Sequence, residues 1–112
     1  MNKLYYKNNR PWLLLFLMLS LDNNPTMAIS VTSEQILSLL KSQQSVQAFQ
    51  LANDAASDNE GDPQFDLAFA LAARAVGKFN QAVYAFERVL FLKPNSIDAR
   101  LGLAITYYDL KN

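Results

Sequence analysis

The chain has 112 residues, with no Cys and no His, and its ten Lys and Arg residues balance ten Asp and Glu residues. These absences exclude a disulfide framework, a Cys/His zinc site, a histidine general base and a thiolate nucleophile built from this chain alone. The zero net charge gives no basic excess for binding nucleic acid or an acidic membrane surface. The length allows one small domain, and the 51% of apolar residues is typical of a chain that packs a core.

The first 28 residues have the order of a secretory signal peptide. Lys3, Lys7 and Arg10 precede an apolar run over residues 11–21, and a polar stretch then leads to Ala28. This run is too short for a transmembrane helix, which needs about 20 apolar residues, so we expect cleavage after Ala28. An uncleaved N-terminal membrane anchor is the alternative. Because the remaining chain has no Cys, the bacterial periplasm, or secretion from the cell, fits it better than the disulfide-stabilised class of small secreted domains.

A period of 34 residues runs through the rest of the chain. Gln47-Ala48 recurs as Gln81-Ala82, and the apolar positions around Leu37 recur around Leu71 and Ile105. Periods of this length indicate stacked helical repeats. We therefore divide residues 29–112 into a degenerate repeat (29–62), a clear repeat (63–96) and a truncated repeat (97–112).

Local signals place the first pair of helices. Thr32 and Gln35 have the spacing of a capping box, which predicts a helix over residues 33–41. Ser45 is expected to cap a second helix, which the polar cluster at residues 57–61 ends.

The second pair has clearer boundaries. Asp62 is expected to cap a helix with Pro63 at its first position, and this helix should run to Val76, with Gly77 as the left-handed residue after it.

The helix after Gly77 should be capped by Asn80 and ended by Pro94, and Ser96 should cap the last helix. The β-branched residues are few and do not alternate, so no strand is predicted. The fold class is therefore all-α.

Small and large residues at fixed spacing carry a family resemblance: Ala70, Gly77, Ala82, Phe86 and Pro94. This pattern resembles the tetratricopeptide repeat. The resemblance implies antiparallel helix pairs stacked as a right-handed α-solenoid, here about two and a half repeats after an N-terminal signal helix. It also implies that Ala70 and Ala82 let paired helices approach closely, and that Phe69 and Phe86 fill the space between repeats.

A narrower resemblance involves residues 61–70, 82–90 and 99–101. They are similar to the N-terminal periplasmic repeats of surface lipoprotein assembly modifiers, which continue into an outer-membrane β-barrel. The resemblance implies an alternative, in which this chain is the N-terminal part of an outer-membrane assembly or secretion protein that presents a client to a missing barrel. The truncated repeat also leaves apolar residues on the last helix without a partner helix, so we expect the chain to self-associate.

The resemblance assigns groove positions to the first helix of each repeat. In the first repeat these positions fall on Ser30, Ser33, Leu37 and Leu40, and in the later repeats on Gln64, Leu67, Leu71, Arg74, Asp98, Leu101, Ile105 and Tyr108. The four apolar residues of the later repeats stand where family members that clamp a carboxylate have Lys, Asn or Arg, which argues against such a clamp.

An apolar groove suits an amphipathic helix or an apolar extended segment of another protein. Alternatively, its leucines are core residues or are covered by the chain's own continuation. Arg74 and Tyr108 are the preferred contact residues, because Arg and Tyr are enriched at interface hot spots. For Arg74, the commoner alternative is a place on a solvated helix face.

Other residue groups are expected to be structural. The carboxylates Asp54, Asp58, Glu60, Asp62 and Asp66 surround one loop and should cap helices or solvate the loop, since they lack calcium-loop spacing. The aromatic residues at helical spacing are expected in the core: Phe65, Phe69, Phe79, Tyr84, Phe86 and Phe91. No nucleophile has a base near it, so the sequence favours an exported, non-catalytic scaffold that binds protein and needs no cofactor or metal.

Overall fold

The computed structural model describes residues 30–111, and the predicted signal segment and its cleavage after Ala28 lie outside them. The described part is all-helical, as predicted. It contains α2 (Ser33–Lys41), α3 (Ser45–Ala55), the short 3-10 turn η1 (Ala56–Asn59), α4 (Pro63–Ala75), α5 (Phe79–Leu92) and α6 (Ile97–Lys111). None of these helices is both long enough and apolar enough to cross a bilayer.

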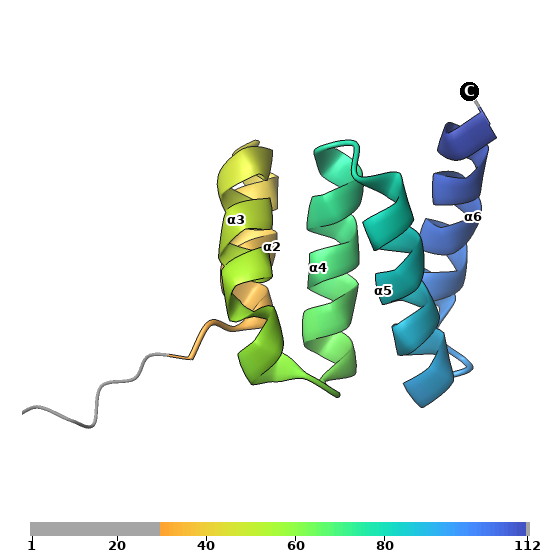
Figure 1. The fold of residues 1–112 in the computed structure, drawn as a ribbon, viewed down its shortest axis with the longest axis horizontal. Coiled ribbons are helices and arrows are strands. Elements are labelled where there is room, and N and C mark those ends of the chain that lie inside the picture. The colour runs from red at the N-terminus through yellow and green to blue at the C-terminus, as the bar shows by residue number, and fades with distance from the viewer. Residues whose placement is uncertain (1–29, 112) are drawn as a thin grey trace, which may run out of the picture.

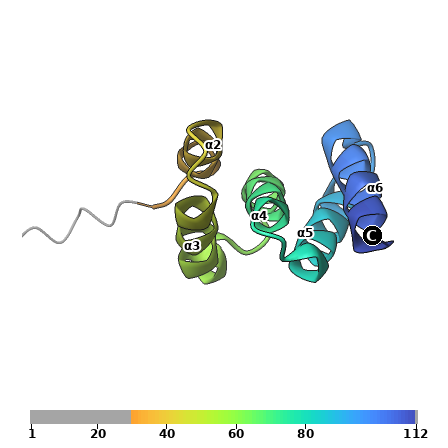
Figure 2. The ribbon, with the colours of Figure 1, turned by 90° about the horizontal axis from the view of Figure 1, so that it is seen from above.

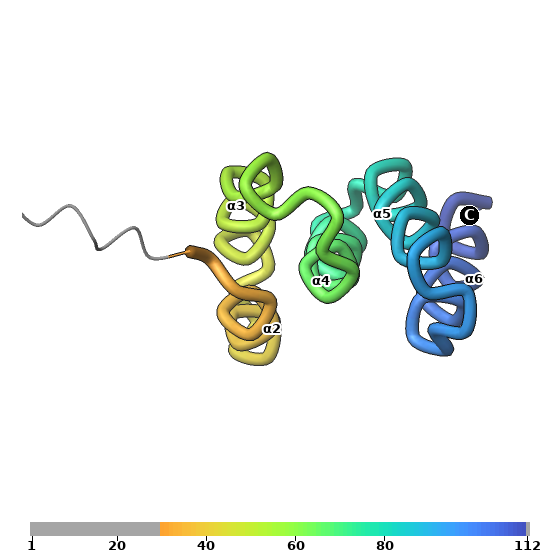
Figure 3. The backbone as a smooth tube through the Cα atoms, turned by 90° about the horizontal axis from the view of Figure 1, so that it is seen from below, coloured from red at the N-terminus to blue at the C-terminus, as the bar shows by residue number. Residues whose placement is uncertain are grey.

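The five α-helices stand side by side, and consecutive helices are antiparallel (Figure 1). Helices α2, α4 and α6 run in one direction, and α3 and α5 run in the other. Each helix packs against its neighbour in sequence, and α4 also packs against α2 and α6. Seen along the helices, α4 occupies the middle of the row, between α2 and α3 on one side and α5 and α6 on the other (Figures 2 and 3).

Three helix starts follow the predicted capping. The Gln35 backbone N–H donates to Thr32 Oγ1 (3.4 Å) and the Thr32 N–H donates to Gln35 Oε1 (3.0 Å), which completes the capping box of α2. Asp62 Oδ1 accepts two backbone N–H groups of the first turn of α4, at 2.9 and 3.3 Å, and Pro63 is the first helical residue. Ser96 Oγ accepts a backbone N–H of α6 at 3.2 Å. These caps satisfy N–H groups that have no partner within a helix.

The predicted caps Ser45 and Asn80 are wrong. Gln44 precedes α3 and Lys78 precedes α5, and neither helix start has a side-chain cap. The turns before them close through the backbone instead: the Gln44 N–H donates to the Leu39 carbonyl (2.9 Å). Each helix begins directly after its turn, so Ser45 and Asn80 fall inside the first turn.

The turn after α4 depends on Gly77. Its φ of +81° lies in the left-handed region, which glycine adopts without a Cβ clash. The Lys78 N–H donates to the Ala73 carbonyl (2.8 Å) across this turn. The helix itself ends at Ala75, one residue before the predicted Val76.

The core combines small residues with a few large ones. Ala70 and Ala82 are fully buried, so α4 and α5 can approach closely. The ring centroids of Phe69 in α4 and Phe49 in α3 are 5.8 Å apart. The buried Phe86 ring of α5 lies directly against Gly102 of α6, where no Cβ could be added without displacing the ring.

Of the six aromatic residues predicted to lie in the core, Phe65, Phe69 and Phe86 are buried, Phe79 is partly buried outside the core cluster, and two are exposed. Tyr84 is 64% exposed and Phe91 is 85% exposed. They are seven residues apart, which places them on one face of α5, opposite the face that buries Ala82, Phe86 and Val89. Within residues 30–111, no helix covers the face of α5 that carries Tyr84 and Phe91. The predicted core position is therefore wrong for both residues.

Candidate binding groove

A hollow of about 540 Å³ lies across α2, α4 and α6, the three helices that run in the same direction. We call it the groove. Its lining residues are Ser33, Glu34, Leu37, Gln64, Leu67, Ala68, Leu71, Arg74, Asp98, Leu101, Gly102 and Ile105.

The structure brings most of the predicted groove positions together. Seven of the eight positions assigned to the second and third repeats line the groove, namely Gln64, Leu67, Leu71, Arg74, Asp98, Leu101 and Ile105. Tyr108 does not line it. Its side chain, near the C-terminal end of α6, is exposed outside the groove. Of the positions assigned to the first repeat, Ser33 and Leu37 line the groove, whereas Ser30 and Leu40 do not.

The apolar part of the groove is half packed and half exposed. Leu67 and Leu71 of α4 are partly buried and pack against the core cluster. Leu101 and Ile105 of α6 are 58% and 37% exposed. The alternative prediction, that these four residues belong to the core, therefore holds in part for Leu67 and Leu71. Leu101 and Ile105 instead present apolar surface to the groove.

Arg74 lies at the end of the groove where α4 and α6 finish. Its Nη2 is 3.1 Å from Asp109 Oδ2, and about a third of each side chain is exposed. Its Nε is shielded from solvent and has no hydrogen-bond acceptor among residues 30–111. Arg74 is therefore an anchored, charge-balanced residue that links α4 to α6, and it does not lie on a solvated helix face.

The opposite end of the groove is acidic. Glu34 and Asp98 lie in the first turns of α2 and α6, and Gln64 lies in the first turn of α4 between them. All three side chains are exposed. Within the described chain, the ion pairs are those of Arg74 with Asp109 and of Arg88 with Asp66, so neither Glu34 nor Asp98 is paired with a cation there.

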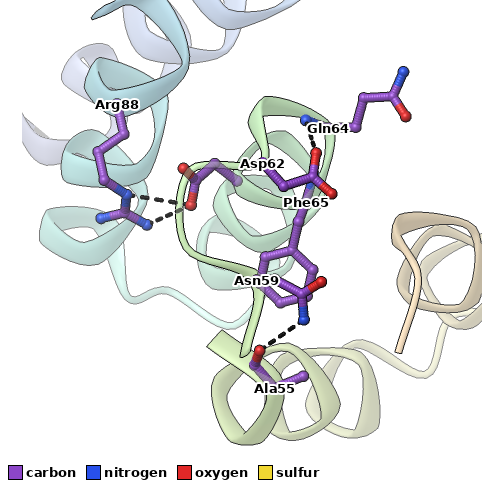
Figure 4. Close-up of polar contacts among 7 residues, drawn as sticks. Ala55, Asn59, Asp62, Gln64, Phe65 and Arg88 are labelled. Carbon is purple, nitrogen blue, oxygen red and sulfur yellow. Dashed lines mark hydrogen bonds and ion pairs between the residues drawn. The ribbon is translucent and has the colours of Figure 1, made fainter. Parts of the chain in front are cut away.

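Of the carboxylates beside α4, Asp62 caps the helix as expected, whereas Asp66 is buried and neither caps a helix nor solvates the loop. Figure 4 shows the Asp62 cap at the start of α4 and the bond from Asn59 Nδ2 to the Ala55 carbonyl, which is 2.8 Å long and closes η1. Arg88 of α5 approaches the same region and donates from Nε and Nη2 to Asp66 Oδ1, at 3.2 and 2.8 Å. Asp66 is buried, so this pair joins α4 to α5. The sequence signal for this pair is weak and consists of one carboxylate in a run of otherwise apolar residues.

Tyr107 connects α6 to α5 on a different side. Its hydroxyl donates to Glu87 Oε1 at 3.3 Å. Desolvation and the neighbouring Glu87 carboxylate raise the pKa of Tyr107 above its usual value. This contact is outside the groove.

Residues 30–111 contain no cluster of three acidic side chains arranged to hold a metal ion. In comparisons with known proteins, no protein-family model matches this sequence, and neither a curated protein nor a solved structure matches it.

Proposed function

We propose that this chain is an exported, non-catalytic scaffold of the tetratricopeptide type that binds a segment of another protein in the groove. The observation that supports this is that seven positions, assigned from the resemblance to the tetratricopeptide repeat, lie around one hollow. A shared hollow is what a binding face built from the first helix of each repeat requires.

In this proposal α2 with α3 and α4 with α5 are successive repeats, α6 begins a third, and the pairs stack as a right-handed solenoid. The packing of α4 against both α2 and α6 supports this arrangement. So does the burial of Phe69 and Phe86 at contacts between the proposed repeats.

The bound segment is apolar or amphipathic. Leu101 and Ile105 present apolar surface that a partner would remove from water, and covering side chains of this exposure contributes about 1 kcal/mol each. Arg74 and Gln64 add hydrogen-bond donors at the two ends of the groove.

Export to the periplasm rests on the order of charged, apolar and small residues before Ile29. Mass spectrometry of the chain recovered from the periplasm tests it, with a mature form beginning at Ile29 expected. A product that still contains Trp12 and sediments with membranes would favour the N-terminal anchor.

Site-specific photo-cross-linking in the native cell tests the binding face. The matched positions are Leu101, in the groove and 58% exposed, and Val46, on α3 outside the groove and 59% exposed. We expect a cross-linker at position 101 to capture a discrete protein adduct and one at position 46 to capture none. Equal capture at both positions, or none at position 101, would contradict the proposal.

A further inference from the structure

We propose that one face of α6 docks an amphipathic helix of another protein, antiparallel to α6, and that an acidic residue of this helix pairs with Arg100. We call this surface the end face, and it carries Arg100, Ala104 and Tyr107. None of these three residues lines the groove. The end face is therefore a second surface, separate from the one in the proposed function.

The 34-residue period allows α6 to be compared with α4, residue by residue. Three residues of α6 are buried, namely Ala99, Gly102 and Thr106. The residues 34 positions earlier on α4 are buried as well, namely Phe65, Ala68 and Ala72. The two helices therefore present equivalent positions to the core.

The two helices differ on the adjacent face. On α4, α5 packs against a face whose residues are buried, namely Asp66, Ala70 and Ala73. The residues 34 positions later are those of the end face, and all three are exposed. The reason is that α6 is the last helix of the row (Figures 1 and 2). On α4 this face is covered by an antiparallel helix, and on α6 it is open.

The shape of the end face suits a helix. Ala104 stands where α4 has Ala70, so a helix can approach α6 as closely as α5 approaches α4. Tyr107 stands where α4 has Ala73. Its hydroxyl donates to Glu87 Oε1, which directs the ring toward α5, and its side chain is still 45% exposed. A docked helix would remove this apolar surface from water.

The charge of the end face determines which helix fits. Arg100 and Asp66 are each the fourth residue of their helix, so the charge at this position is reversed between α6 and α4. Asp66 pairs with Arg88 of α5. Arg100 forms no ion pair within residues 30–111, and its Nη2 donates to the uncharged Pro94 carbonyl at 2.6 Å. The docked helix should therefore carry a carboxylate where α5 has Arg88.

The other charged groups of α5 and α6 leave the surroundings of Arg100 basic. Lys93 is exposed beside Pro94, and Lys111 lies on the side of α6 that carries Arg100. The acidic residues of the two helices are Glu87, Asp98 and Asp109. Asp98 lies about 160° around the helix from Arg100 and lines the groove, and Asp109 pairs with Arg74. Glu87 contacts Tyr107, which is seven residues, or about 10 Å, from Arg100 along the helix.

The test uses the purified chain and fluorescently labelled peptides with the sequence of α5, residues 79–92. One peptide is native and the others carry Arg88→Glu or Arg88→Gln. We expect the glutamate peptide to bind about 1.5- to 5-fold more tightly than the glutamine peptide at low salt, the range for one exposed charge pair. The native arginine peptide should bind most weakly. The variant Arg100→Glu should reverse this order, whereas Lys41→Glu makes the same change in charge on α2 and should preserve it.

A second pair of variants locates the bound peptide. Ala104→Gln should weaken all three peptides, because it blocks the close approach of a helix. Ala75→Gln changes an alanine that is exposed on α4 outside the groove, and should leave binding unchanged.

Four results would overturn the inference. They are the absence of binding, an unchanged order of affinities with Arg100→Glu, equal effects of Ala104→Gln and Ala75→Gln, and loss of binding with Leu101→Gln alone, which would place the peptide in the groove. Sedimentation equilibrium of the chain by itself tests the other occupant. A dimer that Ala104→Gln dissociates and that the glutamate peptide does not displace would show that a second copy covers the end face, which would also overturn the inference.

Discussion

The contact between Phe86 and Gly102 provides a sharp test of the packing between α5 and α6. Gly102 lies inside α6, where alanine is favoured over glycine by about 0.8–1.0 kcal/mol. A Cβ at this position, however, would overlap the fully buried Phe86 ring. Overpacking of this kind costs about 1–3 kcal/mol. We therefore expect Gly102→Ala to lower the free energy of unfolding by about 0–2 kcal/mol, although it improves helix propensity.

The sign should reverse when the ring is removed. Phe86→Leu shortens the side chain and leaves room for the added methyl group, at a cost of its own below the about 3–5 kcal/mol typical of Phe→Ala. In this background we expect Gly102→Ala to stabilise the protein by up to about 1 kcal/mol, the helix-propensity gain. The double-mutant cycle should give a coupling energy of about 1–3 kcal/mol between the two positions.

Urea unfolding, followed by the helical circular dichroism signal, measures the stability of the native chain and of the three variants in this cycle. Ala104→Gly is the matched control, because Ala104 is exposed on the same helix and reports the propensity difference without packing. If Gly102→Ala stabilises the native background by the amount that Ala104→Gly destabilises it, the Phe86 ring does not restrict position 102 and the reasoning is refuted.

Three further predictions follow from single contacts. Asp62→Ala should lower the free energy of unfolding by about 1 kcal/mol through loss of the α4 cap, whereas Asp62→Asn should have little effect in thermal unfolding; equal effects would contradict the capping role. Arg88→Met leaves the buried Asp66 carboxylate without its hydrogen-bond donor and should lower the free energy of unfolding in urea by about 1–2 kcal/mol. This figure is reduced for solvent screening, because Arg88 is half exposed. Adding Asp66→Asn to the same chain should recover part of the loss. Tyr107 should titrate above its usual pKa in an NMR titration, and its contribution to stability should be complete below the unfolded-state pKa near 10 and lost as the pH rises through the raised value. Glu87→Gln should lower the Tyr107 pKa, and an unchanged value would refute the assigned cause.

The helix boundaries that could be predicted from the sequence are those set by neighbouring residues. Thr32 with Gln35, and Asp62 with Pro63, form their contacts within one turn, so their residue types and spacing suffice. Ser45 was misplaced because a backbone bond from the Gln44 N–H to the Leu39 carbonyl closes the turn before α3, and the identity of the side chains does not reveal such a bond.

The groove shows the same division on a larger scale. The resemblance to the tetratricopeptide repeat identified most of its lining residues, because equivalent positions on helices that run in the same direction, such as α4 and α6, face the same side. The pairing of Arg74 with Asp109, and the exposure of Tyr84 and Phe91 on α5, were not predictable in this way. They depend on which helix lies beside which face, and that is set by the packing of segments distant in sequence, since periodicity identifies the residues of a face but not the neighbour that covers it.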